Sequence, residues 1–387
     1  MRYKLKEIFD LQMGKTPSRN NPDYWCTEDN KWISIADLTK TGKYISDTKE
    51  FLSDAAVKES GIKIIPANTV IMSFKLSIGK TAITAEDMYS NEAIMAFHDK
   101  HAVDILPEYI FYLFKYRNWD ESSNKAVMGK TLNKATLAEM EIDVCSIKKQ
   151  REIVAVLDKM MRVLVNREKE LFLLDNLIKA RFVEMFGDPD INPKGWTECA
   201  LSEKLNVVGG YAFKSNMFDE DGGIPVLRIG NINNGYFKPV NLVYWQEDEK
   251  LERYAMYPGD LVMSLTGTVG KDDYGNVCIL GDDYEMYYLN QRNAKLEIKE
   301  GIDKFYISQL LKFEQIKNKL TGISRGVRQA NISNKDILNL VVPVPPIELQ
   351  NQFAEFVKQI DKSKVKVQKA LEETQKLFDS LMQQYFG

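Results

Sequence analysis

Two short segments of this chain end in the way that phosphate-binding loops end. Ile78-Gly79-Lys80-Thr81 and Met128-Gly129-Lys130-Thr131 each place a lysine and a threonine directly after a glycine. A nucleotide-binding loop needs another glycine five positions earlier, because its backbone must wrap around the phosphates. Phe74 and Asn124 occupy that position here. We therefore predict that neither segment binds a nucleotide.

Carboxylates beside a lysine could form a metal-dependent nuclease site. Glu297-Ile298-Lys299 and the upstream Pro189-Asp190 contain the groups that would hold Mg²⁺ near a lysine. Such short patterns often arise by chance, and Glu297 lies in a charged stretch, residues 295–300, that is typical of a strand edge. A nuclease is therefore an alternative function and not the first choice.

Other catalytic arrangements have less support. Asn21-Pro22-Asp23-Tyr24 is similar to the Asn-Pro-Pro-Tyr loop with which adenine methyltransferases hold a flipped base, but Asp23 breaks that pattern. No strand followed by a glycine-rich turn for a methyl-donor cofactor is visible. His98 and His101 have no nucleophile at a diagnostic spacing, so we expect surface histidines.

The cysteines indicate neither a zinc site nor a disulfide framework, because they are far apart and form no C-x-x-C pair. We expect buried thiols at Cys26, Cys145, Cys199 and Cys278. The chain is thus predicted to contain no catalytic residue, no metal and no cofactor.

Composition describes an ordinary globular protein of two or three domains. The 387 residues are 44% hydrophobic and 28% charged, with a net charge of -3. No apolar run approaches the roughly 18 residues of a membrane span, and the N-terminus has no signal core. A cytoplasmic protein without membrane contact is expected. The charge balance neither supports nor excludes DNA binding.

The elements that position these residues occur in two similar copies along the sequence. One predicted helix covers about 150–185 and ends in Met185-Phe186-Gly187; a second starts at about Gln350 and ends in Tyr385-Phe386-Gly387. Upstream, the turn and strand at 65–73 match 257–264. The smaller matches are Trp32-Ile33-Ser34-Ile35 with Val226-Leu227-Arg228-Ile229, Gly79-Lys80 with Gly270-Lys271, and Asn91 with Asn290. A period of about 200 residues indicates a duplicated domain-plus-helix unit and not a solenoid.

Each copy combines a globular part with a helix. The globular parts alternate short β-rich runs with Gly, Asn and Pro, which is typical of an α/β or α+β domain with many turns. We predict four parts: a first globular domain at 1–146, a helix at 147–187, a second globular domain at 188–346 and a helix at 347–387.

Apolar residues in both helices recur in steps of three and four, which predicts a coiled-coil seam. The predicted helix-pair core consists of Leu157, Leu164, Leu171, Ile178, Val357, Leu371 and Phe378. Antiparallel pairing would bury both seams and relate the two domains by a pseudo-twofold axis. Leu157 should then lie near Phe378, and Leu164 near Leu371. The alternative is that each helix packs only on its own domain.

Local motifs of the second copy point to a family. They are the strand-to-helix segment at 341–350, the segment at 328–332, the Pro-Gly-Asp-Leu-Val turn at 258–262 and the stretch at 227–232. With the order of domain and helix, they resemble the specificity (S) subunit of type I DNA restriction-modification systems over essentially the whole chain. The first copy departs from the pattern, with Cys145-Ser146 in place of the prolines and Pro66-Ala67-Asn68 in place of Pro-Gly-Asp.

The resemblance implies a non-catalytic subunit whose two target-recognition domains read a bipartite, asymmetric target in double-stranded DNA. It also implies two methyltransferase subunits on the helices, with S-adenosylmethionine bound in those partners, and motor-nuclease restriction subunits that can join them. One alternative is a self-contained DNA restriction nuclease built on similar recognition domains. Another is a purely structural coiled-coil protein.

The candidate DNA contacts follow from side-chain chemistry, since Arg and Lys read guanine or anchor phosphates and Asn and Gln can read adenine. In the first domain they are Lys15, Thr16, Ser18, Arg19, Lys75, Lys80, Lys130 and Lys134. In the second domain they are Lys214, Arg228, Lys271, Arg292, Arg325, Arg328 and Gln329. The aromatic rings of Tyr211 and Phe213 could pack against a sugar or a base, but we expect them to pack in the core.

An apolar run at Leu171-Phe172-Leu173-Leu174 is too wide for a two-helix seam. Part of it should meet either a partner subunit or the chain's own domains.

Overall fold

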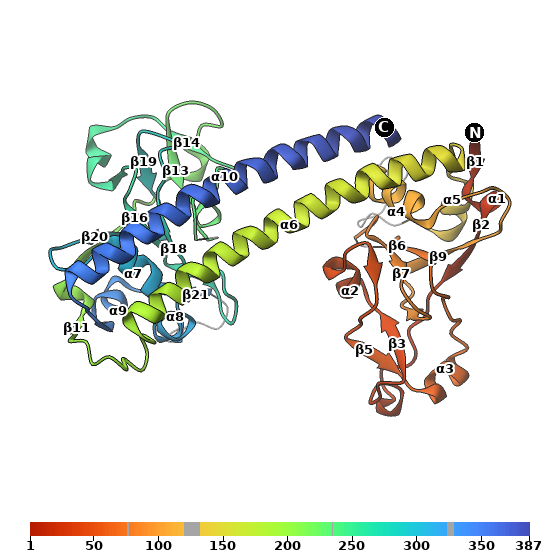
Figure 1. Ribbon diagram of the computed structural model, residues 1–387, viewed down its shortest axis with the longest axis horizontal. Coiled ribbons are helices and arrows are strands. Elements are labelled where there is room, and N and C mark those ends of the chain that lie inside the picture. Colours follow the sequence, from red (N-terminus) through yellow and green to blue (C-terminus); the bar gives the residue numbers. More distant parts are fainter. Residues whose placement is uncertain (76, 120–131, 234, 323–328) are drawn as a thin grey trace. The chain divides into compact units, whose positions relative to one another are not determined.

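The computed structural model describes residues 1–75, 77–119, 132–233, 235–322 and 329–387. It contains two compact units. Unit 1 is Met1–Glu168 with Lys369–Gly387, and unit 2 is Lys169–Gln368. Each unit combines a globular part with one portion of each long helix, α6 and α10 (Figure 1). Because the units divide within these helices, the four-part division predicted from the sequence stays a prediction.

The long helices α6 (Ile147–Phe186) and α10 (Ile347–Phe386) both have 40 residues. They begin at Ile147 and Ile347, and the residues just before them, Ser146 and Pro346, start the two helices in different ways. The Ser146 carbonyl accepts the first intrahelical bond from Gln150, and its hydroxyl accepts from the Lys149 amide. Pro346 accepts the corresponding bond from Gln350, and its ring suits the start of a helix. The serine thus replaces the proline that the first copy lacks.

The first sheet of unit 1 has five strands in the order β2-β9-β6-β7-β4. They are Phe9–Met13, Ile94–Asp99, Val70–Ser73, Thr81–Thr84 and Tyr44–Ile45. The second sheet has the order β5-β3-β8, with strands Glu50–Leu52, Asn30–Ile33 and Tyr89–Ser90. Strand β1 (Arg2–Lys4) pairs with β10 (Glu141–Asp143) just before α6. The helices are α1 (Leu5–Ile8), α2 (Ile35–Lys40), α3 (Asp54–Ser60), α4 (Pro107–Tyr116) and α5 (Lys134–Glu139), with a 3-10 turn η1 (Pro22–Tyr24). The first sheet lies nearer to α6 than the second sheet does (Figure 1).

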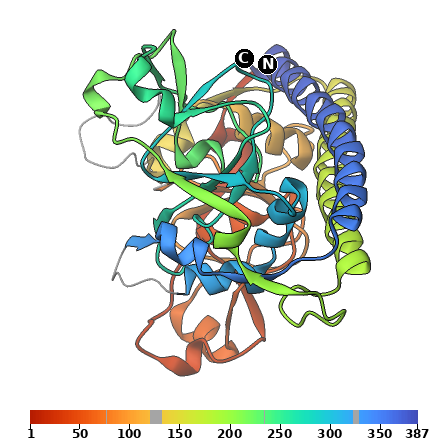
Figure 2. The same cartoon turned by 90° about the vertical axis from the view of Figure 1, so that its left-hand side faces the viewer.

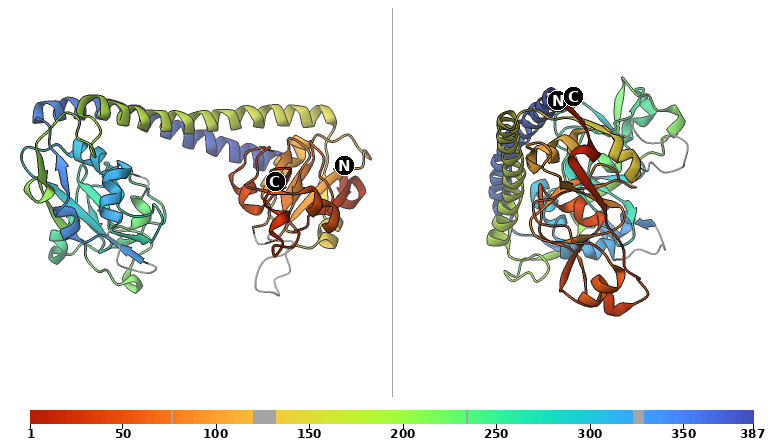
Figure 3. Two further views of the ribbon diagram at one scale, coloured as in Figure 1. Left: turned by 90° about the horizontal axis from the view of Figure 1, so that it is seen from below. Right: turned by 90° about the vertical axis from the view of Figure 1, so that its right-hand side faces the viewer.

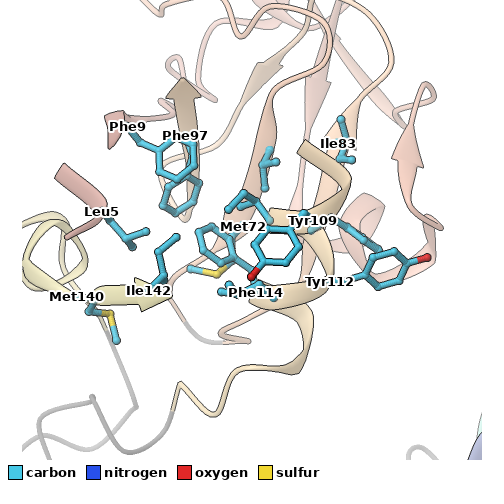
Figure 4. Packing of buried hydrophobic residues seen from close by; sticks show 14 of the residues in the cluster. Leu5, Phe9, Met72, Ile83, Phe97, Tyr109, Tyr112, Phe114, Met140 and Ile142 are labelled. Atoms are coloured by element: carbon cyan, nitrogen blue, oxygen red, sulfur yellow. The ribbon is translucent and has the colours of Figure 1, made fainter. Parts of the chain in front are cut away.

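Both faces of the first sheet in unit 1 are buried at its central strands β6 and β7. In β6, Val70 and Met72 face α4 and the long helices, whereas Ile71 faces the second sheet. This alternation follows from the two-residue period of a strand. Phe97 of β9 meets Phe114 of α4 edge to face, with ring centroids 4.8 Å apart (Figure 4).

Unit 2 repeats this layout. Its first sheet has the order β12-β20-β16-β18, with strands Leu205–Gly209, Asn293–Ile298, Leu261–Ser264 and Val277–Ile279. Its second sheet has the order β14-β13-β19-β15, with strands Tyr244–Trp245, Ile224–Leu227, Tyr287–Leu289 and Ala255–Met256. Strand β11 (Glu198–Ala200) pairs with β22 (Val341–Pro343) just before α10. The order β12-β20-β16-β18 corresponds to β2-β9-β6-β7 of unit 1, and β14-β13-β19 corresponds to β5-β3-β8.

The remaining elements of unit 2 include one pair that extends beyond its first sheet, β17 (Thr266–Thr268) with β21 (Gln329–Asn331). The helices are α7 (Lys304–Leu311), α8 (Glu314–Thr321) and α9 (Asn334–Leu338). The 3-10 turns are η3 (Leu201–Glu203), η4 (Ser215–Met217), η5 (Ile229–Asn231) and η6 (Glu249–Tyr254). In the left-hand view of Figure 3, the strands and short helices of unit 2 lie on one side of its long-helix segments.

The long-helix segments are antiparallel within unit 1. Tyr109 of α4 donates a hydrogen bond of 3.0 Å to the carbonyl of Asp143, just before the start of α6, and its ring contacts Phe386 near the end of α10, with centroids 5.5 Å apart. Tyr112 contacts Phe378 and donates a hydrogen bond of 2.6 Å to Asp158 of α6. Leu157 lies in the same apolar cluster as Phe378. The predicted direction of the helices is therefore present in this unit.

Unit 2 has the same antiparallel arrangement, and its helix segments lie side by side (Figure 2). Phe353 near the start of α10 contacts Phe182 and Phe186 near the end of α6, with ring centroids 5.5 Å apart in each pair. Further along, Lys364 Nζ is 2.6 Å from an Asp175 carboxylate oxygen.

The predicted helix-pair residues differ in burial. The buried ones are Leu157, Leu164, Ile178, Val357 and Phe378. Leu171 and Leu371 are half-buried, at equivalent positions of the two helices. None of the helices in the described ranges has the length and hydropathy of a membrane span. The cytoplasmic location stays a prediction.

A fully buried glutamine near the start of each long helix ties it to the globular part of its unit. Gln150 Oε1 accepts from the Leu106 amide, and its Nε2 donates to the carbonyl oxygen of Cys145, both at 2.9 Å. Gln350 accepts from the Asp303 amide at 2.8 Å and donates to the Pro345 carbonyl at 2.7 Å.

Candidate nucleic-acid interface

The chain crosses from the second sheet to the first sheet of unit 2 through a tight turn of three residues, 290–292. Strand β19 ends at Leu289 and β20 begins at Asn293. The Asn293 amide donates to the Asn290 carbonyl at 2.9 Å, and the side chain of Asn290 accepts from the Arg292 amide at 3.4 Å. We call residues 289–293, and the matching residues 90–94 of unit 1, the sheet junction of each unit.

Other segments are hydrogen-bonded to this junction in unit 2. The Tyr211 amide donates to Leu289 at 2.8 Å, which holds the loop after β12 against the turn. The Leu265 amide donates to the Arg292 carbonyl, and the Ile332 amide donates to the Leu265 carbonyl, both at 2.8 Å. The loop after β12, the end of β16 and the segment before α9 therefore meet at one place.

Unit 1 builds its junction with the same bonds. The Ile94 amide donates to Asn91, whose side chain accepts from the Ala93 amide at 3.0 Å. The remaining bonds run from Lys15 to Ser90 (2.8 Å), from Phe74 to Ala93 (3.0 Å) and from Leu132 to Phe74 (3.1 Å). Lys15 thus corresponds to Tyr211, and Ala93 corresponds to Arg292. One backbone frame carries different side chains in the two copies.

A glycine allows the close approach in each junction. A β-carbon at Gly14 would lie 2.2 Å from the Asn91 carbonyl oxygen, and one at Gly210 would lie 2.1 Å from the Asn290 carbonyl oxygen. Only glycine fits at such distances, because no side-chain atom can approach a backbone oxygen so closely.

In unit 2, two of the predicted DNA contacts, Arg292 and Arg228, are at the junction, and two more follow segments that are connected to it. Arg292 is in the turn, and Arg228 directly follows β13, whose last residue Leu227 accepts a 2.7 Å bond from the Asn293 side chain. Lys271 lies in the connection after β17, and Lys214 follows the loop of Tyr211. All four side chains are exposed, and within the described ranges none has a hydrogen bond or ion pair.

The other candidates of the second domain are less defined. The backbone of Gln329 pairs with Thr268 between β21 and β17. Arg325 and Arg328 lie outside the described residues.

In unit 1, several candidates already have partners within the protein. Arg19 pairs with Glu50, and its guanidinium lies 3.7 Å from the centroid of the Trp25 ring. Lys80 donates to the Thr39 hydroxyl, and Lys15 donates to the Ser60 carbonyl. These lysines and Arg19 would have to exchange those partners to contact DNA.

The remaining candidates of unit 1 differ in exposure. Thr16 donates from its hydroxyl to Glu92 in the junction turn. This bond, with Lys75 and Arg19 nearby, keeps the pKa of the Glu92 carboxyl below its usual value. Ser18 and Lys134 are exposed and Lys75 is half-buried, whereas Lys130 lies outside the described residues.

Sequence reasoning missed part of the junction. Phe213 is buried as expected, but Tyr211 is 38% exposed, because its backbone is held at the rim of the junction. Glu92 and Gln291, the neighbours of Ala93 and Arg292, were also missed. The repeat of Asn91 and Asn290 was the signal that could have found them, since it marks the same turn in both copies.

The structure corrects three smaller expectations. Glu297 lies in β20, which is an interior strand and not a sheet edge. Only Cys278 of the four cysteines is buried, and Cys26 is exposed in the segment before β3. His98 is half-buried and bonds Gln12 at 3.1 Å, since its strand β9 pairs with β2.

The groups of the proposed nuclease site have structural partners. Asp190 pairs with Lys319 at 2.8 Å, and Glu297 lies 4.0 Å from Lys295. In the part of the chain that the structure describes, no group of three or more His, Cys, Asp or Glu residues is arranged to hold a metal ion.

The fold and the two junctions define a duplicated α/β protein, in which each copy presents an exposed turn between two sheets. The family model described as "Type I restriction modification DNA specificity domain" matches residues 1–171 and again residues 193–375. The chain therefore belongs to this family of DNA specificity subunits.

Relatives that match this chain over most of their length are also named as specificity subunits. The MjaIX type I restriction enzyme specificity subunit of Methanocaldococcus jannaschii is 24% identical over 406 residues, which cover 98% of this chain and 90% of the relative. The putative MjaX specificity subunit of that organism is 22% identical and covers 92% of this chain and 86% of the relative. These relatives are named as specificity subunits and not as self-contained nucleases. The chain is thus a recognition subunit, and the nuclease alternative is not retained.

Solved structures show the same fold. The type I restriction-modification S subunit from M. genitalium has a TM-score of 0.55 at 15% identity, covering 100% of this chain and 96% of that protein. A structure concerned with complex assembly and conformational transition of a type I system has a TM-score of 0.52 at 16% identity, covering 100% and 97%.

Proposed function

We propose that the chain reads a bipartite, asymmetric target in double-stranded DNA, with one half read by each copy. The observation that carries this proposal is the sheet junction, which has the same hydrogen-bonded frame in both units but different exposed side chains. Unit 2 presents Tyr211, Gln291 and Arg292, whereas unit 1 has the exposed Lys15 and Glu92 and the buried Ala93 at the equivalent positions. Because the backbone of the two junctions is the same, we expect both copies to dock on DNA in the same way. Because their side chains differ, we expect the two half-sites to differ in sequence.

Two methyltransferase subunits are the proposed partners on the long helices, and they would supply S-adenosylmethionine. Two exposed apolar positions occur in both helices at the same offset. Val165 and Val365 are 53% and 68% exposed, and Leu177 and Leu377 are 46% and 53% exposed. Exposed apolar residues that repeat with the duplication support a partner that binds twice. Motor-nuclease subunits would join this assembly.

The partner surface also includes an unrepeated part. Phe172 is 64% exposed, and Leu173 is exposed beside it, whereas α10 has Glu372 and Glu373 at the equivalent positions. The wide apolar run predicted from the sequence is therefore partly uncovered within unit 2, as a partner surface would require.

Exchange of one copy tests the reading of two half-sites. Residues 188–346 would be replaced by the equivalent domain of another specificity subunit, and the chimera would be expressed with the methyltransferase subunit. Methylation-sensitive sequencing of host DNA should show a new second half-site and an unchanged first half-site. A change in both halves would contradict independent reading by the two copies.

A further inference from the structure

The junction turn of unit 2 has two side chains that no other part of the described protein engages. Gln291 and Arg292 are exposed and form no side-chain hydrogen bond or ion pair within the described ranges. By contrast, Glu92 of unit 1 already accepts a bond from Thr16, and Ala93 has no polar group. The free polar groups of the turn are thus confined to the second copy.

The backbone beneath Arg292 is held on several sides. Its amide donates to the Asn290 side chain, and its carbonyl accepts from Leu265. The next residue, Asn293, is fully buried and bonds the Leu227 carbonyl at 2.7 Å. Because the backbone of Arg292 is already fixed, only its side chain has to be ordered on binding, and less conformational entropy is lost.

The chemistry of this turn fits a base edge. A guanidinium has a planar fork of donors that matches the two acceptors O6 and N7 of guanine in the major groove. Gln291 beside it has both a donor and an acceptor, and the exposed ring of Tyr211 borders the same turn. Resting on the proposed function, we propose that this turn is the base-reading element of unit 2 and that Arg292 reads a guanine of the second half-site.

The duplication provides an internal comparison. Ala93 takes the place of Arg292 in unit 1, on the same frame of bonds. Unit 1 therefore has no guanine reader at this position. The turn is consequently one source of the difference between the two half-sites.

The experiment uses the full-length chain and a duplex DNA library with random sequence. Selection of bound DNA gives the motif of the wild type and of Arg292→Ala, and titration of the selected site gives the affinity. R292A should select the same motif except for one guanine of the second half-site, where all bases become acceptable. Its affinity for the wild-type site should fall roughly 5- to 150-fold, the range of a lost bidentate base contact.

Two further variants separate base reading from charge. Arg292→Lys keeps the charge but loses the fork, so it should relax the same position as R292A. Lys299→Ala removes an exposed lysine at the opposite end of β20 and should leave the motif unchanged. Thermal unfolding checks that each variant is folded.

The outcomes distinguish the two proposals. If the wild type selects no bipartite motif, both are wrong. If the wild type selects one but R292A keeps every position of it, only the role of Arg292 is wrong. The same conclusion follows if R292A weakens all sequences equally and R292K restores the affinity, because Arg292 would then contact a phosphate.

Discussion

Single residues at the junction act through the frame below them. A β-carbon at Gly210 would lie 2.1 Å from a backbone oxygen of Asn290, so Gly210→Ala must displace the turn. We expect the free energy of unfolding to fall by about 1–3 kcal/mol, the usual cost of overpacking. Chemical denaturation of the variant and the wild type measures this difference.

Gly230 provides the matched control for this substitution. It is exposed in the same unit, and a β-carbon there would have no atom within 4 Å. Gly230→Ala should leave stability unchanged or slightly raise it, because alanine restricts the unfolded chain. Equal stabilities of G210A and G230A would show that the loop of Gly210 is not tightly held against the turn.

The cysteines should differ sharply in reactivity. Burial raises the pKa of the Cys278 thiol to about 12, so its thiolate does not form at pH 8. Cys26 is exposed. A disulfide reagent at pH 8 should label Cys26 in the native protein and Cys278 only after denaturant is added, with peptide mass spectrometry as the measurement. Fast native labelling of Cys278 would mean that the space between the sheets of unit 2 opens readily.

The sequence identified candidate DNA-binding side chains better than it identified the groups with which they pair inside the protein. The arginine and lysine candidates were recognisable, but Arg19 pairs with Glu50, 31 residues away. That ion pair depends on the pairing of β3 with β5, which no local pattern reveals. Tyr211 was assigned to the core because aromatic residues usually pack there. Its exposure results from long-range bonds to β19.

Among the elements, the start of each long helix should be unusually sensitive. Gln350→Leu would leave the Asp303 amide and the Pro345 carbonyl without the bonds that the buried glutamine makes. A buried polar group without a partner costs about 1–3 kcal/mol, so the free energy of unfolding should fall by at least that amount. Urea denaturation followed by circular dichroism gives the value.

Gln352 is exposed in the same turn of α10 and serves as the control. Gln352→Leu should change stability by less than about 0.5 kcal/mol, as surface substitutions generally do. A similar loss in both variants would argue against a special role for the buried glutamine.

The helices were predictable because their apolar period is long and regular, and the glycines mark their ends. Gly187 has φ of +84° and donates to Val183, as expected for a helix C-terminus. The chemistry that begins each helix was less evident from the sequence than the helix itself. Ser146 and Pro346 start equivalent helices with different chemistry, so comparison of the two copies obscured the cap. The order of short strands was also beyond local reasoning, since it depends on pairing between distant segments.

For the whole molecule, the repeated exposed residues predict the number of partners. Leu177→Glu and Leu377→Glu alter equivalent positions that are exposed, so neither change should destabilise the chain. Each should remove one of two methyltransferase subunits, because a charge opposes an apolar contact. Mass photometry of the purified complexes would count the subunits.

Exposed polar positions of the same helices supply the comparison. Lys169 and Lys369 are equivalent, and the exposed Lys169 can be changed to Glu as a charge control. This variant should keep both partners. If L177E and L377E also keep both, the partners bind elsewhere on the chain.

The division of the chain into two units determines the order in which their cores can be completed during synthesis. All the residues of unit 2 have been made when Gln368 is added, whereas unit 1 needs Lys369–Gly387. The core of unit 1 includes Phe378 and Met382 of α10. During translation the first 168 residues of unit 1 therefore expose the apolar surface that this part of α10 later covers. Unit 1 can therefore complete its core only after every residue of unit 2 has been synthesised, although most of unit 1 emerges first. Nascent chains of this protein should depend on chaperones until their last helical turns are released.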